Sequence, residues 1–293
     1  MLVFKKVELS DIEKIRPFII NEKSISCDNS IGGIFLWRDY FDMRYCIYGD
    51  TLYLMARGYD KRTVFATPIG PDFDAAVNNI RCFSKEHGIS TVFSFVSEDL
   101  LPRYEGFSYS KESFRDWFDY VYDKNEFVSL RGRKYNGQRN HINRFSRSYP
   151  DHCFEKITAE NISDVILFYK SYKKTSCAAN EMILEDENKT FELLLNYEKY
   201  RLLGGLIRVE GKVAAFSVGE VINDVLFVHV EKADTAYSGI YPVMANTFAS
   251  AYANENVKYI NREDDAGEEG LRTAKLSYHP KLILPKYQLT LKE

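Results

Sequence analysis

A length of 293 residues lies near the upper limit for a single hydrophobic core, which favours two domains. With 45% hydrophobic and 28% charged residues, the composition is that of a globular protein and excludes a disordered chain. The net charge of −3 argues against nucleic-acid binding by the chain as a whole and leaves such a role to local clusters.

The cysteines and the apolar runs indicate the compartment. Five scattered cysteines, Cys27, Cys46, Cys82, Cys153 and Cys177, form no CxxC pair and predict reduced, mostly buried thiols. We therefore expect neither a disulfide framework nor a metal site. The N-terminus lacks the apolar region of a signal peptide, and no apolar run approaches the ~20 residues of a membrane helix. These features predict a cytoplasmic protein without a transmembrane segment.

Hydrophobic periodicity and turn residues predict alternating strands and helices in the first half. The helix that begins at Ser10 or Asp11 has Glu13 at the spacing of a capping box. Expected strands cover residues 3–7, 45–48, 51–56, 63–67, 91–96 and 114–122, and expected helices cover 11–20, 33–41 and 75–87.

The second half repeats this order of elements. Expected helices cover residues 126–149, 159–173, 186–195, 242–254 and 268–275, and expected strands cover 152–157, 202–209, 212–221, 225–231, 257–261 and 282–289. The order resembles the GNAT acyltransferase fold, in tandem. We therefore expect an α/β fold with two GNAT-like domains, residues 1–124 and 125–293, each a mixed, mostly antiparallel sheet flanked by helices. The second domain is predicted to carry the active site.

A basic segment at residues 131–147 is the first candidate for function, because it holds five arginines and one lysine but no acid. On a helix, Arg133, Asn140, Arg144 and Arg147 would lie opposite an apolar stripe. Helices that face only water usually mix acids and bases. The segment therefore predicts binding of an anion such as tRNA, phosphate or a lipid headgroup, with a solvated surface as the alternative.

Polar residues at 261–278 form the second candidate, directly after an expected strand. Ligands of open α/β sheets bind beyond the carboxyl ends of strands. Carboxylates such as Glu263 and Asp264 could take a proton from an attacking amine. Arg272 and Lys275 lie three apart on one helical face, where they could hold an anionic group. The alternative is an exposed acidic loop, and the spacing of a calcium-binding EF-hand is absent.

The end of the strand at residues 225–231 is the third candidate. Alternation directs His229 and Glu231 to one face, and Lys232 follows at the strand end. A single histidine in a strand is more often structural, whereas Glu231 and Lys232 are predicted to be catalytic because charges that end a central strand need partners.

The loop before the helix at residues 242–254 has one glycine, Gly239, followed by Tyr241 and Pro242. Helix N-termini bind anions, and acetyl-CoA-dependent GNAT proteins place a glycine-rich loop here to hold pyrophosphate. The departure from that loop argues against simple acetyl-CoA use.

Several motifs together resemble the DUF2156 family, which is similar to the C-terminal catalytic domain of phosphatidylglycerol lysyltransferases. They are Arg139-Asn-His-Ile-Asn-Arg-Phe145, Val230-Glu-Lys-Ala233, Gly239-Ile-Tyr-Pro242, Ile260-Asn-Arg-Glu-Asp264 and Gly270-Leu-Arg-Thr-Ala-Lys-Leu-Ser-Tyr278. The resemblance implies a tandem GNAT fold of the Fem-like type, which moves aminoacyl groups from aminoacyl-tRNA. By the same resemblance, the site residues comprise Arg139, Asn140, Glu231, Lys232, Asn261, Arg262, Glu263, Asp264, Arg272, Lys275 and Tyr278.

Three functions follow as expectations. The first is transfer of an aminoacyl group from aminoacyl-tRNA to an amine or hydroxyl acceptor, with Arg133, Arg144 and Arg147 on tRNA phosphates and no tightly bound cofactor. The alternatives are an acyl-CoA-dependent N-acyltransferase and a non-catalytic module that binds an anionic ligand. Full-length lipid aminoacyltransferases carry membrane spans that this sequence lacks, so a lipid acceptor would require peripheral contact of the basic segment with anionic lipid.

Overall fold

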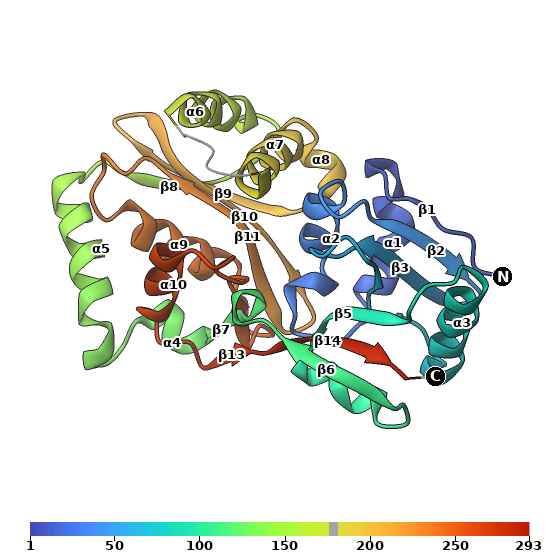
Figure 1. Ribbon diagram of the computed structural model, residues 1–293. Coiled ribbons are helices and arrows are strands. Elements are labelled where there is room, and N and C mark those ends of the chain that lie inside the picture. The colour runs from blue at the N-terminus through green and yellow to red at the C-terminus, as the bar shows by residue number, and fades with distance from the viewer. Residues whose placement is uncertain (176–180, 293) are drawn as a thin grey trace. The chain divides into compact units, whose positions relative to one another are not determined.

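The structure, a computed structural model, describes residues 1–175 and 181–292 and divides into two compact units (Figure 1). The first unit comprises Met1–Asp119, Asp264–Gly267 and Leu284–Glu293, and the second comprises Tyr120–Glu263 and Glu268–Ile283. The expected boundary between residues 124 and 125 therefore lies close to the first passage of the chain between units. The later returns of the chain to the first unit were not predicted.

The first unit contains a seven-stranded sheet in the order β1-β2-β3-β4-β5-β14-β6, in which only β4 and β5 pair in parallel. Its strands are β1 (Lys5–Lys6), β2 (Arg44–Tyr48), β3 (Thr51–Arg57), β4 (Thr63–Phe65), β5 (Val92–Ser97), β6 (Tyr109–Ser113) and β14 (Lys286–Leu291). Its helices are α1 (Ile12–Ile19), α2 (Ile31–Trp37) and α3 (Phe73–Glu86), with 3-10 turns η1 (Leu9–Asp11), η2 (Cys27–Asn29), η3 (Glu98–Tyr104) and η4 (Arg115–Trp117).

Helix α3 supplies one side of the core of this unit. Its apolar face, including Val77 and Ile80, packs against Phe93 of β5 and Leu289 of β14 in one buried cluster. Each aromatic or aliphatic side chain buried in this way contributes on the order of 1.5–3 kcal/mol. The predicted end of the helix is confirmed, because Gly88 follows it with a φ of +63°, a conformation that glycine adopts without strain.

Two details of the first unit correct the expectations. The capping box is formed by Glu8 and Asp11 around η1, so the predicted pairing with Glu13 is wrong. Of the four cysteines that the structure describes, Cys27 and Cys46 are buried and Cys82 and Cys153 are exposed, so only half of them fit the prediction of mostly buried thiols. Cys177 lies outside the described residues.

The second unit contains a seven-stranded sheet in the order β13-β7-β12-β11-β10-β9-β8. Strands β11 and β12 pair in parallel, and the pairs within β8–β11 and between β7 and β12 are antiparallel. The strands are β7 (Asp119–Asp123), β8 (Cys153–Lys156), β9 (Leu203–Val209), β10 (Lys212–Ile222), β11 (Val225–Ala233), β12 (Tyr259–Asn261) and β13 (Leu282–Leu284). The helices are α4 (Lys124–Ser129), α5 (Asn136–Ser148), α6 (Ile162–Thr175), α7 (Glu181–Leu195), α8 (Tyr197–Tyr200), α9 (Ile240–Tyr252) and α10 (Glu269–Leu276), with the 3-10 turn η5 (Arg133–Tyr135).

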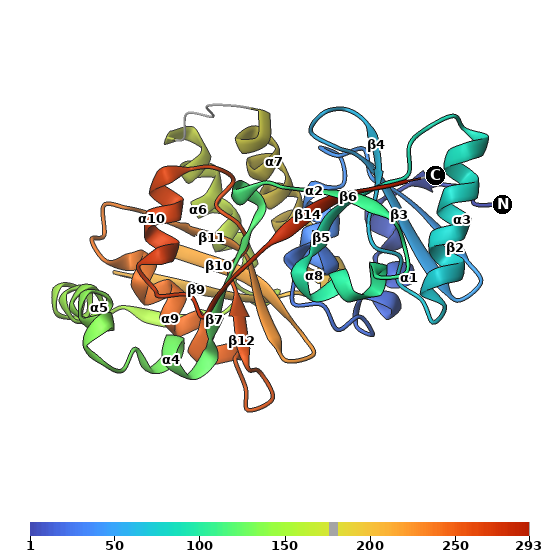
Figure 2. The same cartoon turned by 60° about the horizontal axis from the view of Figure 1, so that its bottom comes forward.

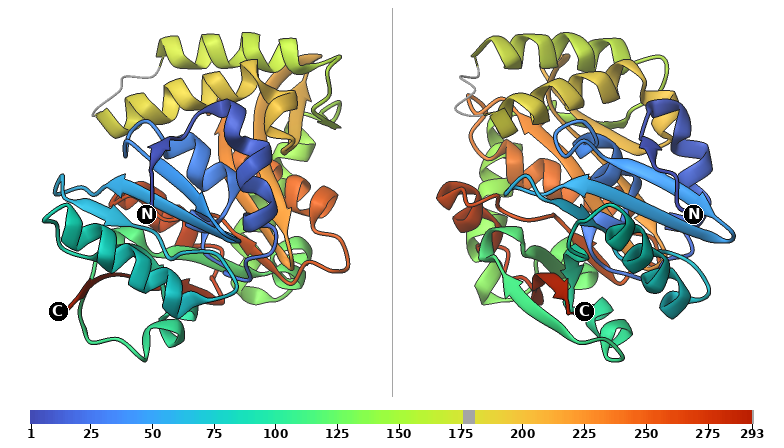
Figure 3. Two further views of the ribbon diagram at one scale, coloured as in Figure 1. Left: turned by 90° about the vertical axis from the view of Figure 1, so that its right-hand side faces the viewer. Right: turned by 45° about the vertical axis from the view of Figure 1, so that its right-hand side comes forward.

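Helices cover both faces of this second sheet. Helix α6 contacts β10 on one face, and α9 contacts β9, β10 and β11 on the other, as Figure 1 shows. Figure 3 gives two side views in which the yellow-green helix α6 and the yellow helix α7 lie together along the sheet. The predicted antiparallel meander β9–β10–β11 is confirmed, with turns at Gly211 and Asn223 that both have positive φ.

The expected long helix at residues 126–149 is wrong, because the chain breaks into α4, η5 and α5. Leu130 adopts the left-handed conformation with φ +48°, and Gly132 has φ +95°. The Arg139 guanidinium donates to the carbonyl oxygens of both residues and so satisfies groups that the break exposes. The apolar residues of the segment still reach one core, where Phe127, Tyr135 and Phe145 are buried; of these three, Phe127 and Tyr135 come before α5.

Two expected strands, 114–122 and 282–289, are each divided between the two units. Turn η4 follows β6, and the next strand, β7, then joins the second sheet. Pro285, which has no N–H to donate, separates β13 from β14. Strand β14 lies between β5 and β6 in the first sheet, as the red strand in Figure 2 shows. A local pattern carries no information on such a distant pairing.

Candidate functional site

Polar side chains meet where the parallel pair β11–β12 ends. The pairing stops at Phe227 opposite Asn261, whereas β11 continues to Ala233. A bulge at His229 interrupts β11, because Val228 and Val230 pair with consecutive residues of β10. The predicted regular alternation through His229 is therefore wrong. The residues beyond this point are joined to the end of β12 by side chains.

Glu231 and Arg262 form the central pair of this site. Arg262 Nη2 donates to Glu231 Oε1 over 2.9 Å, and the guanidinium also lies over the rings of Phe127 and Tyr278. Burial raises the pKa of Glu231, although the Arg262 charge opposes that shift. Glu231 Oε2 is buried and has no hydrogen-bond partner within residues 1–175 and 181–292. The carboxylate therefore has one anchored oxygen and one buried oxygen without a hydrogen-bond partner among the described residues.

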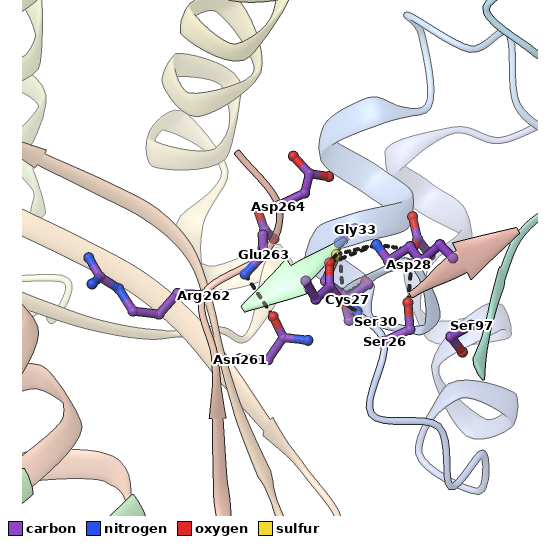
Figure 4. A network of polar contacts seen from close by, with 12 residues as sticks. Ser26, Cys27, Asp28, Ser30, Gly33, Ser97, Asn261, Arg262, Glu263 and Asp264 are labelled. Atoms are coloured by element: carbon purple, nitrogen blue, oxygen red, sulfur yellow. Dashed lines mark hydrogen bonds and ion pairs between the residues drawn. The ribbon is translucent and has the colours of Figure 1, made fainter. Parts of the chain in front are cut away.

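Residues around Arg262 hold its backbone in place. Lys275 Nζ donates to the Arg262 carbonyl oxygen over 2.6 Å, and Asn261 Oδ1 accepts from the Glu263 amide over 2.7 Å. Figure 4 shows the Arg262 side chain directed away from those of Asn261 and Glu263. Tyr278 stacks on the ring of Phe127 at a centroid distance of 5.0 Å. The structure thus gives Asn261, Lys275 and Tyr278 positioning contacts, and their contact with a substrate stays a prediction.

His229 lies between two carboxylates. Its Nε2 is 2.9 Å from Glu220 Oε1, and its Nδ1 is 2.7 Å from Glu263 Oε1. Burial alone would lower the pKa of His229, but the hydrogen bonds to Glu220 and Glu263 raise it to about 9. The imidazole is therefore protonated at neutral pH. Its two hydrogen bonds join β11 to β10 and to the segment that follows β12. This fits the structural role that strand histidines usually have.

The remaining predicted residues of this region have separate surroundings. Lys232 Nζ is 2.5 Å from Asp186 Oδ2 of α7. Asp264 belongs to the first unit, where its Oδ1 accepts from the Ala266 amide. Arg272 lies in α10, and its amide donates to the Glu268 carbonyl oxygen. The structure thus brings Glu231 and Arg262 together and leaves the expected carboxylate pair Glu263–Asp264 divided between two units.

The basic segment keeps exposed cations, although it is not one helix. Arg133 lies in η5, whereas Asn140, Arg144 and Arg147 lie in α5, and all four residues are exposed. Arg144 donates to Ser238 Oγ over 2.9 Å, and Arg147 donates to the Asn143 carbonyl oxygen. The predicted cluster of four on one continuous helix is therefore corrected to three residues of α5 and one of the preceding turn.

The N-terminus of α9 is closely packed. Gly239 has φ +93°, and a Cβ atom added there would lie 2.8 Å from the carbonyl oxygen of His141 in α5. Only glycine meets both conditions without strain. The single glycine of this loop therefore serves the contact between α9 and α5.

Sequence reasoning missed a buried ion cluster in the first unit. Lys286 Nζ lies 2.5 Å from Asp28 Oδ2, 2.7 Å from Asp119 Oδ1 and 3.4 Å from Cys27 Sγ. The Cys27 amide and thiol both donate to Asp119, and Figure 4 shows Cys27 and Asp28 beside each other. Burial would lower the pKa of Lys286, but the two carboxylates raise it well above its usual value. The sequence offered one feature that could have indicated this cluster: a charged lysine directly after a proline, within the strand expected at residues 282–289.

Two seven-stranded mixed sheets, each with flanking helices, give this chain a tandem GNAT-like fold. The solved structure of FemX shares this fold, with a TM-score of 0.62, 8% identity and coverage of 97% of this chain and 96% of that chain. Residues 22–290 match the family described as phosphatidylglycerol lysyltransferase, C-terminal, and the chain belongs to that family.

Three further proteins are similar to this chain. A conserved protein of unknown function from Bacteroides thetaiotaomicron is 31% identical, with a TM-score of 0.91 and full coverage of both chains. L-PGS from Bacillus licheniformis has a TM-score of 0.67 at 16% identity and covers 95% of this chain and 91% of its own. An uncharacterized protein from Mycoplasmoides gallisepticum is 23% identical over 175 residues, and the match spans about half of that curated relative, 54%.

The described helices include none long and apolar enough to cross a membrane. Within residues 1–175 and 181–292, no group of three or more His, Cys, Asp or Glu residues is arranged to hold a metal ion.

Proposed function

We propose that the protein is an aminoacyltransferase that moves an aminoacyl group from aminoacyl-tRNA to an amine or hydroxyl acceptor, either a lipid headgroup or a small molecule. The observation that carries the proposal is the Glu231 carboxylate, which has one oxygen on Arg262 and the other without a partner among the described residues. It lies beyond the paired ends of parallel strands, where open α/β sheets bind ligands. The family described as phosphatidylglycerol lysyltransferase supports the same class of reaction.

Glu231 is the general base of this proposal. The acceptor nitrogen or oxygen attacks the ester carbonyl of the aminoacyl group, and Glu231 Oε2 takes the acceptor proton. The ester C–O bond to the ribose then breaks, and Glu231 gives the proton to the ribose oxygen, which leaves as a hydroxyl. Burial raises the pKa of Glu231 toward the neutral range, where a general base is most effective. Arg262 is the positioning residue for this carboxylate, since its guanidinium fixes Oε1 and leaves Oε2 available.

Exposed arginines are the proposed contact for the donor. Arg133, Arg144 and Arg147 would contact tRNA phosphates, which bind guanidinium groups through paired hydrogen bonds. The same surface would approach anionic lipid if the acceptor is a headgroup. The close packing of Gly239 against α5 at the α9 N-terminus supports a donor other than an acyl-CoA, whose pyrophosphate needs an open loop.

A transfer assay tests the chemistry. The full chain is incubated with tRNA charged with labelled amino acids and with either phosphatidylglycerol vesicles or a mixture of small amines. Glu231→Gln should lower the transfer rate at least about 100-fold, because the amide cannot accept the proton. Glu210→Gln, at an exposed residue of the β9–β10 turn, is the matched control and should keep full activity. Equal rates for Glu231→Gln and the parent protein would contradict the proposal.

A binding assay tests the donor. Affinity for charged tRNA should fall steeply with salt, and Arg144→Ala should reduce the slope of log K against log[salt] by about 1. Lys85→Ala removes one exposed cation from α3 and should leave the slope unchanged. Binding that does not respond to salt, or consumption of an acyl-CoA without any transfer from tRNA, would favour the acyl-CoA alternative.

A further inference from the structure

A cavity of about 70 Å³ lies within the first unit and takes no part in the transfer proposed above. Its lining comes from η2, α2, strands β3, β4 and β5, and the segments that follow α2 and β4, and it includes Asp28, Trp37, Phe41, Ala66 and Phe95. A single water needs about 10–15 Å³, so the cavity has room for a group of several heavy atoms. Its walls and its charge indicate what such a group is.

Part of the cavity wall is aromatic, beside aliphatic residues such as Ile34 and Leu54. Trp37 and Phe41 lie at a centroid distance of 6.3 Å, and Phe41 and Phe95 at 5.9 Å. Behind them, Trp117 lies 4.6 Å from Phe95 and stacks with Tyr59. Aromatic faces carry negative electrostatic potential and attract ammonium groups. Both tryptophans of the chain belong to this group of rings.

Phe95 reaches the cavity through an unusual backbone. Its φ is +57°, a left-handed conformation that is uncommon for a bulky residue. The pairing of β5 with β14 is irregular at this point, since Phe93 and Val96 oppose Leu289 and Tyr287. Bulges of this kind redirect a side chain, and strained residues concentrate at ligand sites. The strain therefore supports a binding role for this wall.

The charge beside the cavity is negative. Asp28 Oδ2 accepts from Lys286 Nζ and from Ser26 Oγ, and 32% of the Asp28 side chain is accessible. Asp119 is fully buried on the other side of Lys286, so one ammonium faces two carboxylates. Within the described part of the chain, Asp28 Oδ1 has no hydrogen-bond partner. Arg57 also lines the cavity but is exposed, where solvent screens its charge.

We propose that this cavity binds a small organic ammonium ion, with its nitrogen on Asp28 Oδ1 and its apolar part among Trp37, Phe41 and Phe95. The bound cation would balance the excess carboxylate, since uncompensated charge beside apolar walls is unfavourable. The aromatic faces would add cation–π attraction.

Titration of the full chain with butylamine and with phenethylamine tests this site, read by tryptophan fluorescence and by calorimetry. The amines should bind saturably, 1-butanol should bind at least about tenfold more weakly, and butyrate should not bind, because only an ammonium pairs with Asp28. Asp28→Asn should raise the Kd of the amines at least about tenfold. Asp74→Asn, which removes an exposed carboxylate from α3, should leave the Kd unchanged.

Ala66→Leu gives a second variant that leaves every charge in place, in case Asp28→Asn fails to fold. It fills the cavity and should abolish amine binding. Equal affinity for butylamine and 1-butanol, amine binding that survives Ala66→Leu, or no saturable binding of either amine would each overturn the proposal. None of these results depends on aminoacyl transfer, so this site and the transfer reaction succeed or fail separately.

Discussion

The two units each bury a cation, but they partner it differently. In the first unit, Lys286 lies between the two carboxylates of Asp28 and Asp119, and its side chain is fully buried. In the second unit, Arg262 has one carboxylate, Glu231, and uses aromatic faces for the rest of its surface. A lysine ammonium is a compact point charge, whereas a guanidinium is planar and stacks. The first arrangement has one carboxylate more than its cation can balance. The second leaves one carboxylate oxygen without a hydrogen-bond partner among the described residues.

Removal of the first cation is the strongest way to test this comparison. Lys286→Met should lower the free energy of unfolding of the first unit by about 3–5 kcal/mol, because two buried carboxylates lose their partner. Both tryptophans, Trp37 and Trp117, lie in the first unit, so tryptophan fluorescence in urea reports on that unit. Lys292→Met, at an exposed lysine, is the control and should change little. A loss below 1 kcal/mol would mean that the cluster contributes no more than surface charges do.

The second unit has its own cation between two carboxylates, His229, which titrates in an accessible range. The folded-state pKa of about 9 exceeds the unfolded value of about 6.5, so protonation stabilises the fold. The contribution, on the order of 3 kcal/mol, should be complete below pH 6.5, decline between pH 6.5 and 9, and be absent above pH 9. Urea unfolding followed by circular dichroism at pH 6, 8 and 9.5 measures this decline.

His229→Gln should flatten that profile, while His141→Gln, at an exposed histidine of α5, should leave it as steep as in the parent protein. A profile with the same slope in His229→Gln would assign the pH dependence to other groups. The fluorescence transition of the first unit should move less over the same range, because its cluster contains lysine in place of histidine.

Replacement of Arg262 by lysine keeps the positive charge but changes the shape of the charged group, and so tests what the planar guanidinium contributes. Arg262→Lys should cost about 1–2 kcal/mol, since an ammonium keeps the ion pair with Glu231 but loses the stacking on Phe127 and Tyr278. It should also lower the rate of aminoacyl transfer, because Glu231 would lose its fixed orientation. Stability is measured by urea unfolding and transfer by the labelled-tRNA assay. Full activity in Arg262→Lys would show that charge alone positions Glu231.

Local signals predicted those parts of the molecule that depend on neighbouring residues. The meander β9–β10–β11 follows from alternation and from the turns at Glu210-Gly211 and Asn223-Asp224. The polar site after β12 follows from charges at a strand end. The break at Leu130 was missed because leucine is a good helix former, and the left-handed conformation there is fixed by the contacts of Arg139.

Distant pairings were beyond any local pattern. Cys27 and Lys286 are 259 positions apart, and no periodicity links them. The cation of the first unit therefore could not be assigned from sequence, and neither could the cavity beside it. Glu231 and Arg262 are only 31 positions apart and flank consecutive strands of one sheet, which is why their neighbourhood could be expected.

The position of β14 has a consequence for synthesis on the ribosome. A chain emerges from its N-terminus, and domains usually fold in that order as they appear. Here the sheet of the first unit has a gap between β5 and β6 until residues 286–291 have been made. The buried carboxylates Asp28 and Asp119 likewise wait for Lys286. The segment that is translated first therefore completes its fold late. A nonsense mutation just before residue 286 would remove β14 and so disrupt the fold of the N-terminal part of the chain.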